Sequence, residues 1–368
     1  MPLRVALTHA FSWPEVRRGG ERFLHELAGA LARRGHDVTI IAGARRASLE
    51  TDGGVRVIRL PRGDPGIVFR AERWFGRFVV PVLAAGRFDV VHSLGVQDAV
   101  GSLIAQRIHR GRRTVYTNLG LPLRASWARR PDGTAHQRVV DDIDVYGCLS
   151  SYAQRHLQDE FRRRGAITPG GVRLDVFRAT AERAPEPTLL YSGALDQPRK
   201  HVATLLEAVS ILAKREPRVR LWLSGPGDVG QLLAGAPEAA RERTHVLPLG
   251  SPDDQPERYA AAWATVYATH NEAFGLVLVE SLACGTPIVP SDHAGLPELM
   301  EPGVGAVATV GDPHSLADAC EAALALAGEA GIRERCRAAA ERHDWDRSVA
   351  PRIEALYLGD ERDAGQLG

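Results

Sequence analysis

The feature that most constrains the fold is an alternating pattern that runs along the chain and restarts half-way. Short apolar runs alternate with longer amphipathic segments, in which apolar residues recur every three or four positions. Runs of the first kind are typical of strands buried on both faces of a parallel sheet. Segments of the second kind are typical of helices that cover such a sheet. The pattern therefore predicts an α/β fold.

The first half of the chain carries the pattern clearly. The expected strands are Leu3–Leu7, Asp37–Ala42, Val55–Leu60, Phe88–His92, Arg113–Thr117 and Asp144–Leu149. A helix is expected over Glu21–Arg34, and Gly35 should end it, because glycine is common just beyond a helix. The apolar face of this helix consists of Phe23, Leu24, Leu27 and Leu31.

The second half repeats this order after an interruption. A polar, proline-bearing stretch covers Ala179–Pro187. The succession of strand, loop and long helix that began at Leu3 begins again at Thr188, so the offset is 188 − 3 = 185 residues. Further strands are expected at Val219–Leu223, His245–Leu249, Thr265–Thr269 and Pro287–Val289. The restart indicates two domains of the same class, as expected for 368 residues.

We therefore expect two doubly wound, Rossmann-like domains that face each other across a ligand cleft. The first should span residues 1–178 and the second residues 187–345. In such sheets ligands bind beyond the carboxyl ends of the strands, so functional residues are expected in the loops that follow the strands. The tail 361–368 is expected to be disordered.

Composition narrows the class of protein. The chain has 46 Lys+Arg and 45 Asp+Glu, a formal charge of +1, which removes the electrostatic case for binding nucleic acid. The N-terminus lacks a signal-peptide core, and the longest apolar run, Phe78–Gly86, is too short to span a membrane. No cysteine pair has CxxC spacing among Cys148, Cys284, Cys320 and Cys336. A soluble cytoplasmic protein with reduced cysteines is expected.

The most informative segment is HNEAFGLVLVESLACGTPIVPSDHAGLPE, residues 270–298. It follows an expected strand and opens a helix near Phe274 and Gly275. The N–H groups of Phe274, Gly275 and Leu276 would have no partner within the helix, and such a helix start is a site for an anion. The small Gly275 would let a ligand approach closely.

Two carboxylates flank this expected anion site. Glu272 precedes the helix, and Glu280 lies roughly 7–8 Å further along it. A carboxylate cannot bind phosphate, but it accepts hydrogen bonds from hydroxyl groups. The arrangement suits a nucleotide sugar: the diphosphate on the helix start, Glu272 on the sugar hydroxyls and Glu280 on the ribose.

At this point the chain resembles the retaining glycosyltransferases of family 4, which have the GT-B fold. The E-x7-E pair Glu272 and Glu280, followed by ACGTP and SDHAGLPE, carries the resemblance. Other segments in family order are GGE at 19–21, FDVVHSL, GGVRLDVF, WLSGPGD, LGSPDDQPERYAAAW and HDWDRSVAPRIEALY. The resemblance implies that Gly20 and Gly225 contact the donor. It also implies that a C-terminal helix, residues 346–360, returns to the first domain.

The loop SGALDQPRKH, residues 192–201, resembles the family's diphosphate clamp. Its cations would neutralise the charge that develops on the leaving diphosphate. Lys200, one of only two lysines, matches the family's lysine, and Arg199 stands beside it. The family's arginine after the strand glycine is here Ala194. Replacements for its charge include Arg199 and the following residues: Arg173, Arg17 and Arg18.

The acceptor side is expected in the first domain. Family members often carry a histidine in a T-x-H-G context, where this chain reads TNLG with Asn118 and Leu119. His9 and His92 lie at the ends of expected strands, and together with Asn118 they are the candidates for contact with the acceptor. Many retaining GT-B enzymes are thought to use front-face attack, in which the leaving phosphate takes the acceptor proton. A protein base is then unnecessary, and a thiol acceptor would relax the demand further.

No metal or other cofactor is expected. The thirteen histidines show no HExxH or other short ligand spacing. Asp142-x-Asp144 resembles a DxD metal motif, but a polar turn is the favoured interpretation. The basic, aromatic stretch Phe69–Val79 is expected to be a helix packed on its own sheet, with membrane docking as the less favoured alternative.

The sequence thus predicts a retaining, metal-independent glycosyltransferase that moves a sugar from a UDP- or GDP-sugar to a small acceptor. Natural-product and thiol biosynthesis are the pathways considered, while the acceptor itself and the oligomeric state stay open. One alternative is a GT-B phosphorylase or a nucleotide-sugar epimerase. The other, suggested by Ala194 and Leu119, is a catalytically weak subunit that binds sugar nucleotides.

Overall fold

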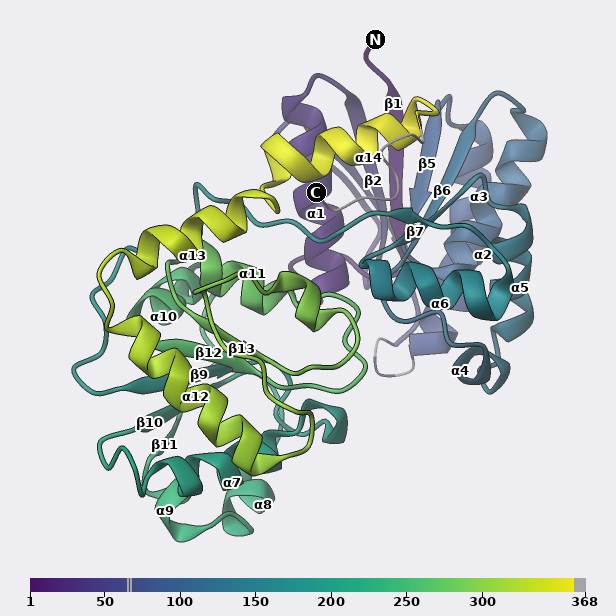
Figure 1. The fold of residues 1–368 in the computed structure, drawn as a ribbon. Coiled ribbons are helices and arrows are strands. Elements are labelled where there is room, and N and C mark those ends of the chain that lie inside the picture. Colours follow the sequence, from purple (N-terminus) through teal and green to yellow (C-terminus); the bar gives the residue numbers. More distant parts are fainter. Residues whose placement is uncertain (65, 67, 361–368) are drawn as a thin grey trace. The chain divides into compact units, whose positions relative to one another are not determined.

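A computed structural model describes residues 1–64, 66 and 68–360 (Figure 1). The chain divides into two compact units: Met1–Gly171 with the C-terminal segment from Trp345, and Val172–Asp344. Both units are α/β structures with parallel sheets, as the sequence predicts. The expected tail 361–368 lies outside the described residues.

Unit 1 contains the N-terminal elements and the last helix. Its strands are β1 (Arg4–His9), β2 (Asp37–Ala44), β3 (Ser48–Asp52), β4 (Val55–Pro61), β5 (Val90–Ser93), β6 (Arg113–Asn118), β7 (Val145–Cys148) and β8 (Ala166–Ile167). Its helices are α1 (Gly19–Arg33), α2 (Val68–Ala85), α3 (Val96–Ile108), α4 (Arg124–Ala128), α5 (Gly133–Asp142), α6 (Ser151–Phe161), the π-helical η4 (Trp345–Val349) and α14 (Ala350–Tyr357).

The strand order of unit 1 is β3-β4-β2-β1-β5-β6-β7-β8, parallel except where β3 meets β4. The chain winds outward from β1 in one direction and from β5 in the other, so the topological switch point lies between these strands. Helix α2 covers one face, where Phe75 and Val79 join a core with Ile41 of β2. Trp74 and Phe78 of the same helix are 46% and 37% exposed, so membrane docking by this helix stays an untested alternative.

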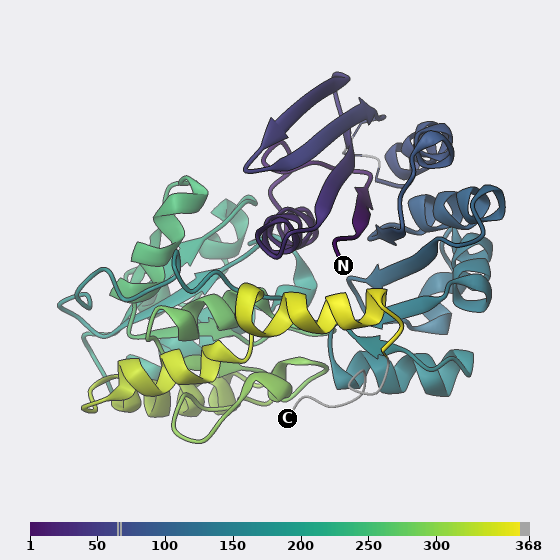
Figure 2. The same cartoon turned by 90° about the horizontal axis from the view of Figure 1, so that it is seen from above.

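The last helix belongs to unit 1 (Figure 2). Trp345 Nε1 donates a hydrogen bond to Glu26 of α1 over 2.6 Å. Glu354 of α14 pairs with Arg34 over 2.5 Å and with His36 over 3.1 Å. These contacts attach the C-terminal segment to the face of the sheet that α1 covers.

Unit 2 contains the remaining elements. Its strands are β9 (Thr188–Ser192), β10 (Arg220–Ser224), β11 (Thr244–Val246), β12 (Ala264–Tyr267) and β13 (Ile288–Pro290). Its helices are α7 (Val202–Leu212), α8 (Gly230–Ala234), α9 (Glu238–Arg241), α10 (Gln255–Ala261), α11 (Leu276–Ala283), α12 (Pro313–Ala327) and α13 (Ile332–Glu341), with the 3-10 turns η1 (Pro198–Lys200), η2 (Pro252–Asp254) and η3 (Leu296–Leu299).

The sheet of unit 2 has the parallel order β11-β10-β9-β12-β13. Its switch point lies between β9 and β12, because the chain winds outward from each of them in opposite directions. Helices α7 and α12 contact each other, as do α11 and α13 (Figure 1). The loops after β9 and β12 therefore meet where a doubly wound sheet binds its ligand.

The boundary between the units falls earlier than the expected linker. The proline-bearing stretch Ala179–Pro187 belongs to unit 2. Its backbone is held there, since Ala184 accepts a hydrogen bond from Trp263 Nε1 over 2.8 Å and Ala181 accepts one from Arg333 over 3.1 Å. The stretch that interrupts the sequence pattern is thus part of unit 2, and these hydrogen bonds hold its backbone there.

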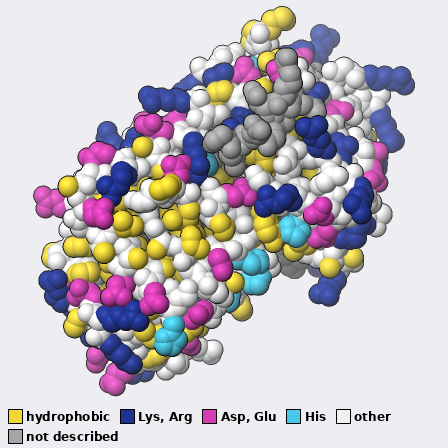
Figure 3. Space-filling model, viewed as in Figure 1, with side chains coloured by type: hydrophobic (Ala, Val, Ile, Leu, Met, Phe, Trp, Pro, Cys, Tyr) yellow, Lys and Arg dark blue, Asp and Glu magenta, His cyan; other side chains and the backbone are white. Residues whose placement is uncertain are grey.

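The surface carries mixed charge. Figure 3 shows Lys and Arg side chains interspersed with Asp and Glu on the visible face, as the near-zero net charge implies. The four cysteines are free and buried, as expected. Burial raises the pKa of Cys284 and Cys336 to about 12, so these thiols stay protonated. No described helix is both long and apolar enough to span a membrane.

Candidate active site

Two loops of unit 2 meet at the switch point. The loop after β9 carries Arg199 and Lys200, and the loop after β12 carries Glu272. The N–H group of His270 donates to the carbonyl oxygen of Arg199 over 2.8 Å and joins the two loops directly. Residues that lie 72 positions apart in the sequence are thereby placed in contact.

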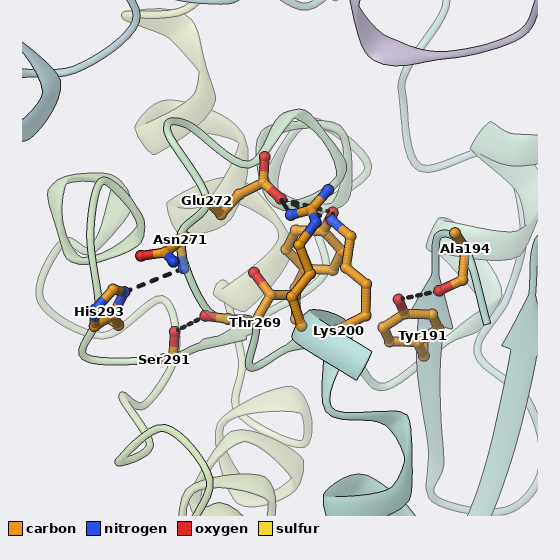
Figure 4. A network of polar contacts seen from close by, with 10 residues as sticks. Tyr191, Ala194, Lys200, Thr269, Asn271, Glu272, Ser291 and His293 are labelled. Atoms are coloured by element: carbon orange, nitrogen blue, oxygen red, sulfur yellow. Dashed lines mark hydrogen bonds and ion pairs between the residues drawn. The ribbon is translucent and has the colours of Figure 1, made fainter. Parts of the chain in front are cut away.

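The centre of the site is a charged cluster of four side chains (Figure 4). Lys200 Nζ lies 2.7 Å from Glu272 Oε2, and Arg199 Nη1 lies 3.1 Å from the same oxygen. The hydroxyl of Tyr267 also donates to Glu272 Oε2, over 3.3 Å, and Lys200 contacts both this hydroxyl and the face of the ring. The structure thus brings together the predicted residues Lys200, Arg199 and Glu272.

Burial differs across the cluster. The side chain of Lys200 is 6% exposed and that of Glu272 is 20% exposed, whereas Arg199 is half-exposed. Burial lowers the pKa of Lys200 and outweighs the opposing attraction of Glu272. Burial alone would raise the pKa of Glu272, but the combined attraction of Lys200 and Arg199 lowers it below its ordinary value. The lowered pKa of Glu272 favours its ionised form, and this carboxylate lies between the two basic side chains.

Glycines shape the loops around the cluster. Gly225 has φ +147°, and a Cβ added there would lie 1.9 Å from the carbonyl oxygen of Gly193. Gly275 has φ +101°, and a Cβ there would lie 2.6 Å from Leu296. Both positions need glycine for its conformation and for its size. At Gly225 the close approach of Gly193, in the loop after β9, explains why glycine is needed. Contact of Gly225 with the donor stays a prediction.

Helix α11 begins four residues beyond Glu272. Gly275 precedes its first turn in the left-handed conformation, and Leu278 N–H donates to the Gly275 carbonyl. The first N–H groups of a helix have no partner within it, so the amides near Leu276 are candidates to bind an anion, and their contact with a phosphate stays a prediction. Phe274 is buried and its ring packs edge-on against His343 at 5.3 Å.

Glu280 lies within α11 and is 3% exposed. It is close enough to Cys284 to help raise the pKa of that thiol, although burial is the larger cause. The structure therefore buries this carboxylate within α11. Its contact with a ribose stays a prediction.

Tyr267 and Tyr191 were missed by the sequence analysis. The Tyr267 ring packs against the Tyr191 ring at 6.0 Å, and the Tyr191 hydroxyl donates to the carbonyl of Ala194 over 2.9 Å (Figure 4). Tyr267 is the last residue of β12, and this position, next to the loop where ligands bind, was the signal that could have identified it as a site residue. Ala194 brings no charge to the site. Of the two arginines of this unit that were considered as replacements for that charge, Arg199 lies in the cluster. Arg173 pairs with Asp175 instead.

Unit 1 brings two of the predicted residues, His9 and Gly20, together. His9 ends β1, and its Nε2 lies 3.4 Å from Oε1 of Glu21 in the first turn of α1. A Cβ added to Gly20 would lie 2.5 Å from Leu119 and 3.7 Å from His9 Nε2. Burial lowers the pKa of His9, but the carboxylates led by Glu21 reverse this and leave the pKa raised. Here Gly20 is a neighbour of the acceptor-side candidate His9.

His92 has a different environment from the one expected. It is fully buried, its Nδ1 is bonded to the hydroxyl of Tyr357 over 2.7 Å and its Nε2 to Thr117 over 2.8 Å. Burial lowers its pKa to about 3, so the ring stays neutral. With both nitrogens occupied, His92 anchors α14 to the sheet and has no nitrogen left for an acceptor. Asn118 is 5% exposed, and its Oδ1 accepts from the Gly120 N–H over 3.2 Å.

The Asp142-x-Asp144 motif has a structural role. Asp144 Oδ2 accepts hydrogen bonds from the backbone and the hydroxyl of Thr114 and from Gln106, at 2.7–2.9 Å. Among the described residues, no group of three or more His, Cys, Asp or Glu side chains could hold a metal ion. The cations of the charged cluster are Lys200 and Arg199.

Comparisons with known proteins identify the family of the chain. Residues 17–176 match the family model of Glycosyltransferase Family 4, and residues 173–343 match that of Glycosyl transferases group 1. A phosphatidyl-myo-inositol mannosyltransferase of Mycobacterium tuberculosis is 30% identical, over 96% of each chain. The chain belongs to glycosyltransferase family 4.

Two further matches extend the family assignment. A D-inositol 3-phosphate glycosyltransferase of Geodermatophilus obscurus is 31% identical over 76% of this chain and 68% of its own length. The catalytic domain of starch synthase IV from Arabidopsis thaliana, bound to ADP and acarbose, aligns over 100% of both chains with a TM-score of 0.76 and 16% identity. This likeness shows the GT-B fold. The resemblance seen in the E-x7-E segment is thus confirmed at the level of family and fold.

Proposed function

We propose that this family 4 glycosyltransferase transfers a sugar from a nucleotide diphosphate sugar to a small acceptor, with retention at the anomeric carbon and without a metal ion. Unit 2 would bind the donor and unit 1 the acceptor. The buried free cysteines fit a cytoplasmic enzyme.

One observation carries the proposal: two cations and a carboxylate share one point beside a helix start. Lys200 and Arg199 converge on Glu272 Oε2, and α11 begins four residues after Glu272. A diphosphate needs positive charge and N–H donors, and these are the two things present here. A sugar attached to that diphosphate needs a hydroxyl acceptor, and Glu272 is one.

The residues would act on the departing group. As the glycosidic bond breaks, negative charge grows on the diphosphate, and a preorganised cation stabilises that state more than the ground state. Lys200 is suited to this because its burial excludes water and Tyr267 fixes its position. No side chain is required as the base, since the leaving phosphate oxygen would accept the proton of the attacking hydroxyl.

Binding of the donor would exchange one anion for another. Glu272 pairs with both cations and offsets part of their charge. When the diphosphate arrives, Lys200 and Arg199 would turn to it, and Glu272 would become available for the sugar hydroxyls. Glu272 is thus proposed as a counter-ion before binding and a sugar ligand afterwards.

A nucleotide screen tests the donor site. Calorimetry with UDP, GDP, ADP and dTDP should find one that binds, and Lys200→Met should weaken that binding at least tenfold. Lys214 is exposed and is the only other lysine, so Lys214→Met is a matched control. Binding of none of the four, or equal binding by both variants, would refute the site.

Product analysis tests the reaction. With the donor identified, NMR of the product should show the anomeric configuration of the donor, and EDTA should leave the rate unchanged. Inverted product would refute retention, and loss of rate restored by a divalent cation would refute metal independence.

A further inference from the structure

The loop that follows β13, residues 291–295, has no role in the function proposed above. Strands β12 and β13 are parallel neighbours in the sheet of unit 2, with Tyr267 opposite Pro290 at their carboxyl ends. Loops that follow parallel neighbours leave the same edge of a sheet. The loop after β13 therefore lies beside residues 269–272, the segment that carries Glu272.

Two hydrogen bonds from this loop bracket Glu272. The Asn271 N–H donates to Nδ1 of His293 over 3.2 Å (Figure 4). The Gly295 N–H donates to the carbonyl oxygen of Glu272 over 3.0 Å. One bond holds the chain just before Glu272 and the other holds it just after. The backbone torsions of Asn271 and Glu272, which determine where the carboxylate lies, are thus fixed from both ends.

The supporting loop is itself anchored to unit 2. Ser291 Oγ donates to the carbonyl oxygen of Thr269 over 2.7 Å. The Asp292 N–H donates to the carbonyl oxygen of Ala308 over 2.8 Å, and Asp292 Oδ1 accepts a hydrogen bond from the Val310 N–H over 3.0 Å. Because the loop is held on both sides, it provides a fixed support for its neighbour.

Asn271 has a backbone conformation that needs such support. Its φ is +55°, in the left-handed region, which residues other than glycine adopt at a cost in free energy. Asparagine is one of the side chains that tolerate this region best. The N–H group that His293 binds belongs to this same residue, so the hydrogen bond acts where the backbone departs from its ordinary conformations.

The ring of His293 makes a second contact with the same segment. Its centroid lies 4.1 Å from the centroid of the His270 ring. The His270 N–H in turn donates to the carbonyl oxygen of Arg199 over 2.8 Å. Two of the contacts of His293 are therefore different in kind: an acceptor nitrogen on Asn271 and a packing contact with His270.

The hydrogen bond to Asn271 acts on the geometry of the site more than on folding. Asn271 is exposed, so water would satisfy its N–H if His293 could not accept from it. Loss of the bond would leave no buried donor without a partner, and its cost to the free energy of unfolding is therefore small. Its loss would, however, free the backbone that holds Glu272 against Lys200, and a binding group displaced by about 1 Å loses much of its effect.

We propose that His293 is a positioning residue for the donor: its Nδ1 holds Asn271 so that the Glu272 carboxylate lies where the sugar of a nucleotide sugar would bind. This inference rests on the proposed function, because it takes Glu272 as the ligand of the sugar hydroxyls. His293 acts through Asn271 and does not itself contact the diphosphate. Its effect should therefore appear in the affinity for the sugar moiety and not in the affinity for a free nucleoside diphosphate.

Two substitutions separate the two contacts of His293. His293→Phe keeps a ring against His270 but removes the acceptor nitrogen. His293→Asn removes the ring, but its Oδ1 lies close to the position of Nδ1 and can accept from the Asn271 N–H. The matched control is His245→Phe, which removes an imidazole from an exposed position on β11 in the same unit.

Calorimetry on the full-length protein would compare each nucleotide sugar with its free diphosphate: UDP-glucose with UDP, and GDP-mannose with GDP. The measured quantity is the ratio of the dissociation constant of the nucleotide sugar to that of the diphosphate. His293→Phe should raise this ratio about five- to tenfold without weakening the diphosphate, because the sugar loses a well-placed hydrogen-bond acceptor. His293→Asn and the control should keep the ratio within about twofold of the wild-type value.

The outcomes are distinct. A ratio that rises in His293→Phe and is restored in His293→Asn supports the inference. An unchanged ratio in His293→Phe, an equal rise in both variants, or an equal loss of affinity for the nucleotide sugar and the diphosphate would overturn it. Failure of the wild-type protein to bind any nucleoside diphosphate would refute the proposed function itself, whereas an unchanged ratio in a protein that binds nucleotide sugars overturns this inference alone.

Discussion

Replacing Glu272 with glutamine separates the two roles proposed for this carboxylate. Glu272 Oε2 lies 2.7 Å from Lys200 Nζ and 3.1 Å from Arg199 Nη1. A diphosphate would be drawn to the same cations and repelled by the carboxylate. We therefore expect Glu272→Gln to bind the free nucleoside diphosphate more tightly than the wild-type enzyme while it transfers sugar more slowly.

The magnitude follows from these distances. A phosphate oxygen in contact with Lys200 Nζ would lie about 5–6 Å from Glu272 Oε2, where two unit charges repel by about 3 kcal/mol at an effective dielectric constant of about 20. Glu272 is 20% exposed, so screening by water reduces the repulsion to about 1–2 kcal/mol. The expected gain in affinity is about 5- to 30-fold.

The same substitution should cost stability in the absence of ligand. Lys200 is 6% exposed and would keep Tyr267 and the glutamine carbonyl as partners, but it would lose its buried counter-ion. Removing one member of a buried pair is usually destabilising, here by about 1–3 kcal/mol because the pair is partly exposed and a hydrogen bond remains. Saturating nucleoside diphosphate should then raise the melting temperature more in the variant than in the wild type.

Calorimetry and thermal unfolding provide the assay. The matched control is Glu207→Gln, which removes the same charge from an exposed position on α7 in the same unit. The control should change neither affinity nor melting temperature. If Glu272→Gln bound the diphosphate with wild-type or weaker affinity, the carboxylate would not be competing for the cations, and the exchange described here would be wrong.

Three further predictions concern turnover, backbone and pH. Lys200→Met should lower kcat about 100-fold or more, because a single preorganised charge at a leaving group contributes on this scale, and steady-state kinetics would show it. Gly225→Ala should lower the melting temperature by several degrees, since its Cβ would lie 1.9 Å from a carbonyl oxygen, whereas Gly111→Ala, with open space around it, should not. Burial raises the pKa of Glu72 from 4.5 to about 7, so stability should fall as pH rises between these values. Denaturation of Glu72→Gln should therefore show a gain on the order of 2–3 kcal/mol at pH 8 and none at pH 4.

The strands that the sequence predicts differ in burial from the strands that it does not predict. Runs such as the one over Arg4–His9 are buried on both faces and were predicted to within a few residues. Strand β3, Ser48–Asp52, is exposed along its whole length and pairs antiparallel at the sheet edge. Its sequence SLETD has neither an apolar run nor an alternation of apolar and polar residues, so the sequence pattern does not predict a strand there. Strand β8 has only two residues and is defined by its partner β7.

The residues of the candidate site also differ in whether the sequence could predict them. Lys200, Arg199 and Glu272 could be predicted because each lies in a loop that follows a strand, in a segment that resembles its family counterpart. The role of Tyr267 could not, since its hydrogen bond to Lys200 spans 67 residues and depends on how two loops cross. His92 was assigned to the acceptor side from its strand position alone. Its bond to Tyr357, 265 residues away, could be seen only in the folded unit.

The candidate site in unit 2 pairs its cations with an internal carboxylate, and this has a consequence for binding. Glu272 lies against both Lys200 and Arg199. An arriving diphosphate must compete with this carboxylate, so binding is an exchange of anions and its net free energy is smaller than the new contacts alone would give. The pairing also stabilises the protein before the donor binds, because an unpaired ammonium group buried to the extent of Lys200 would otherwise be destabilising. Glu272 is 20% exposed, so added salt should affect diphosphate binding here less than it would at a fully exposed ion pair.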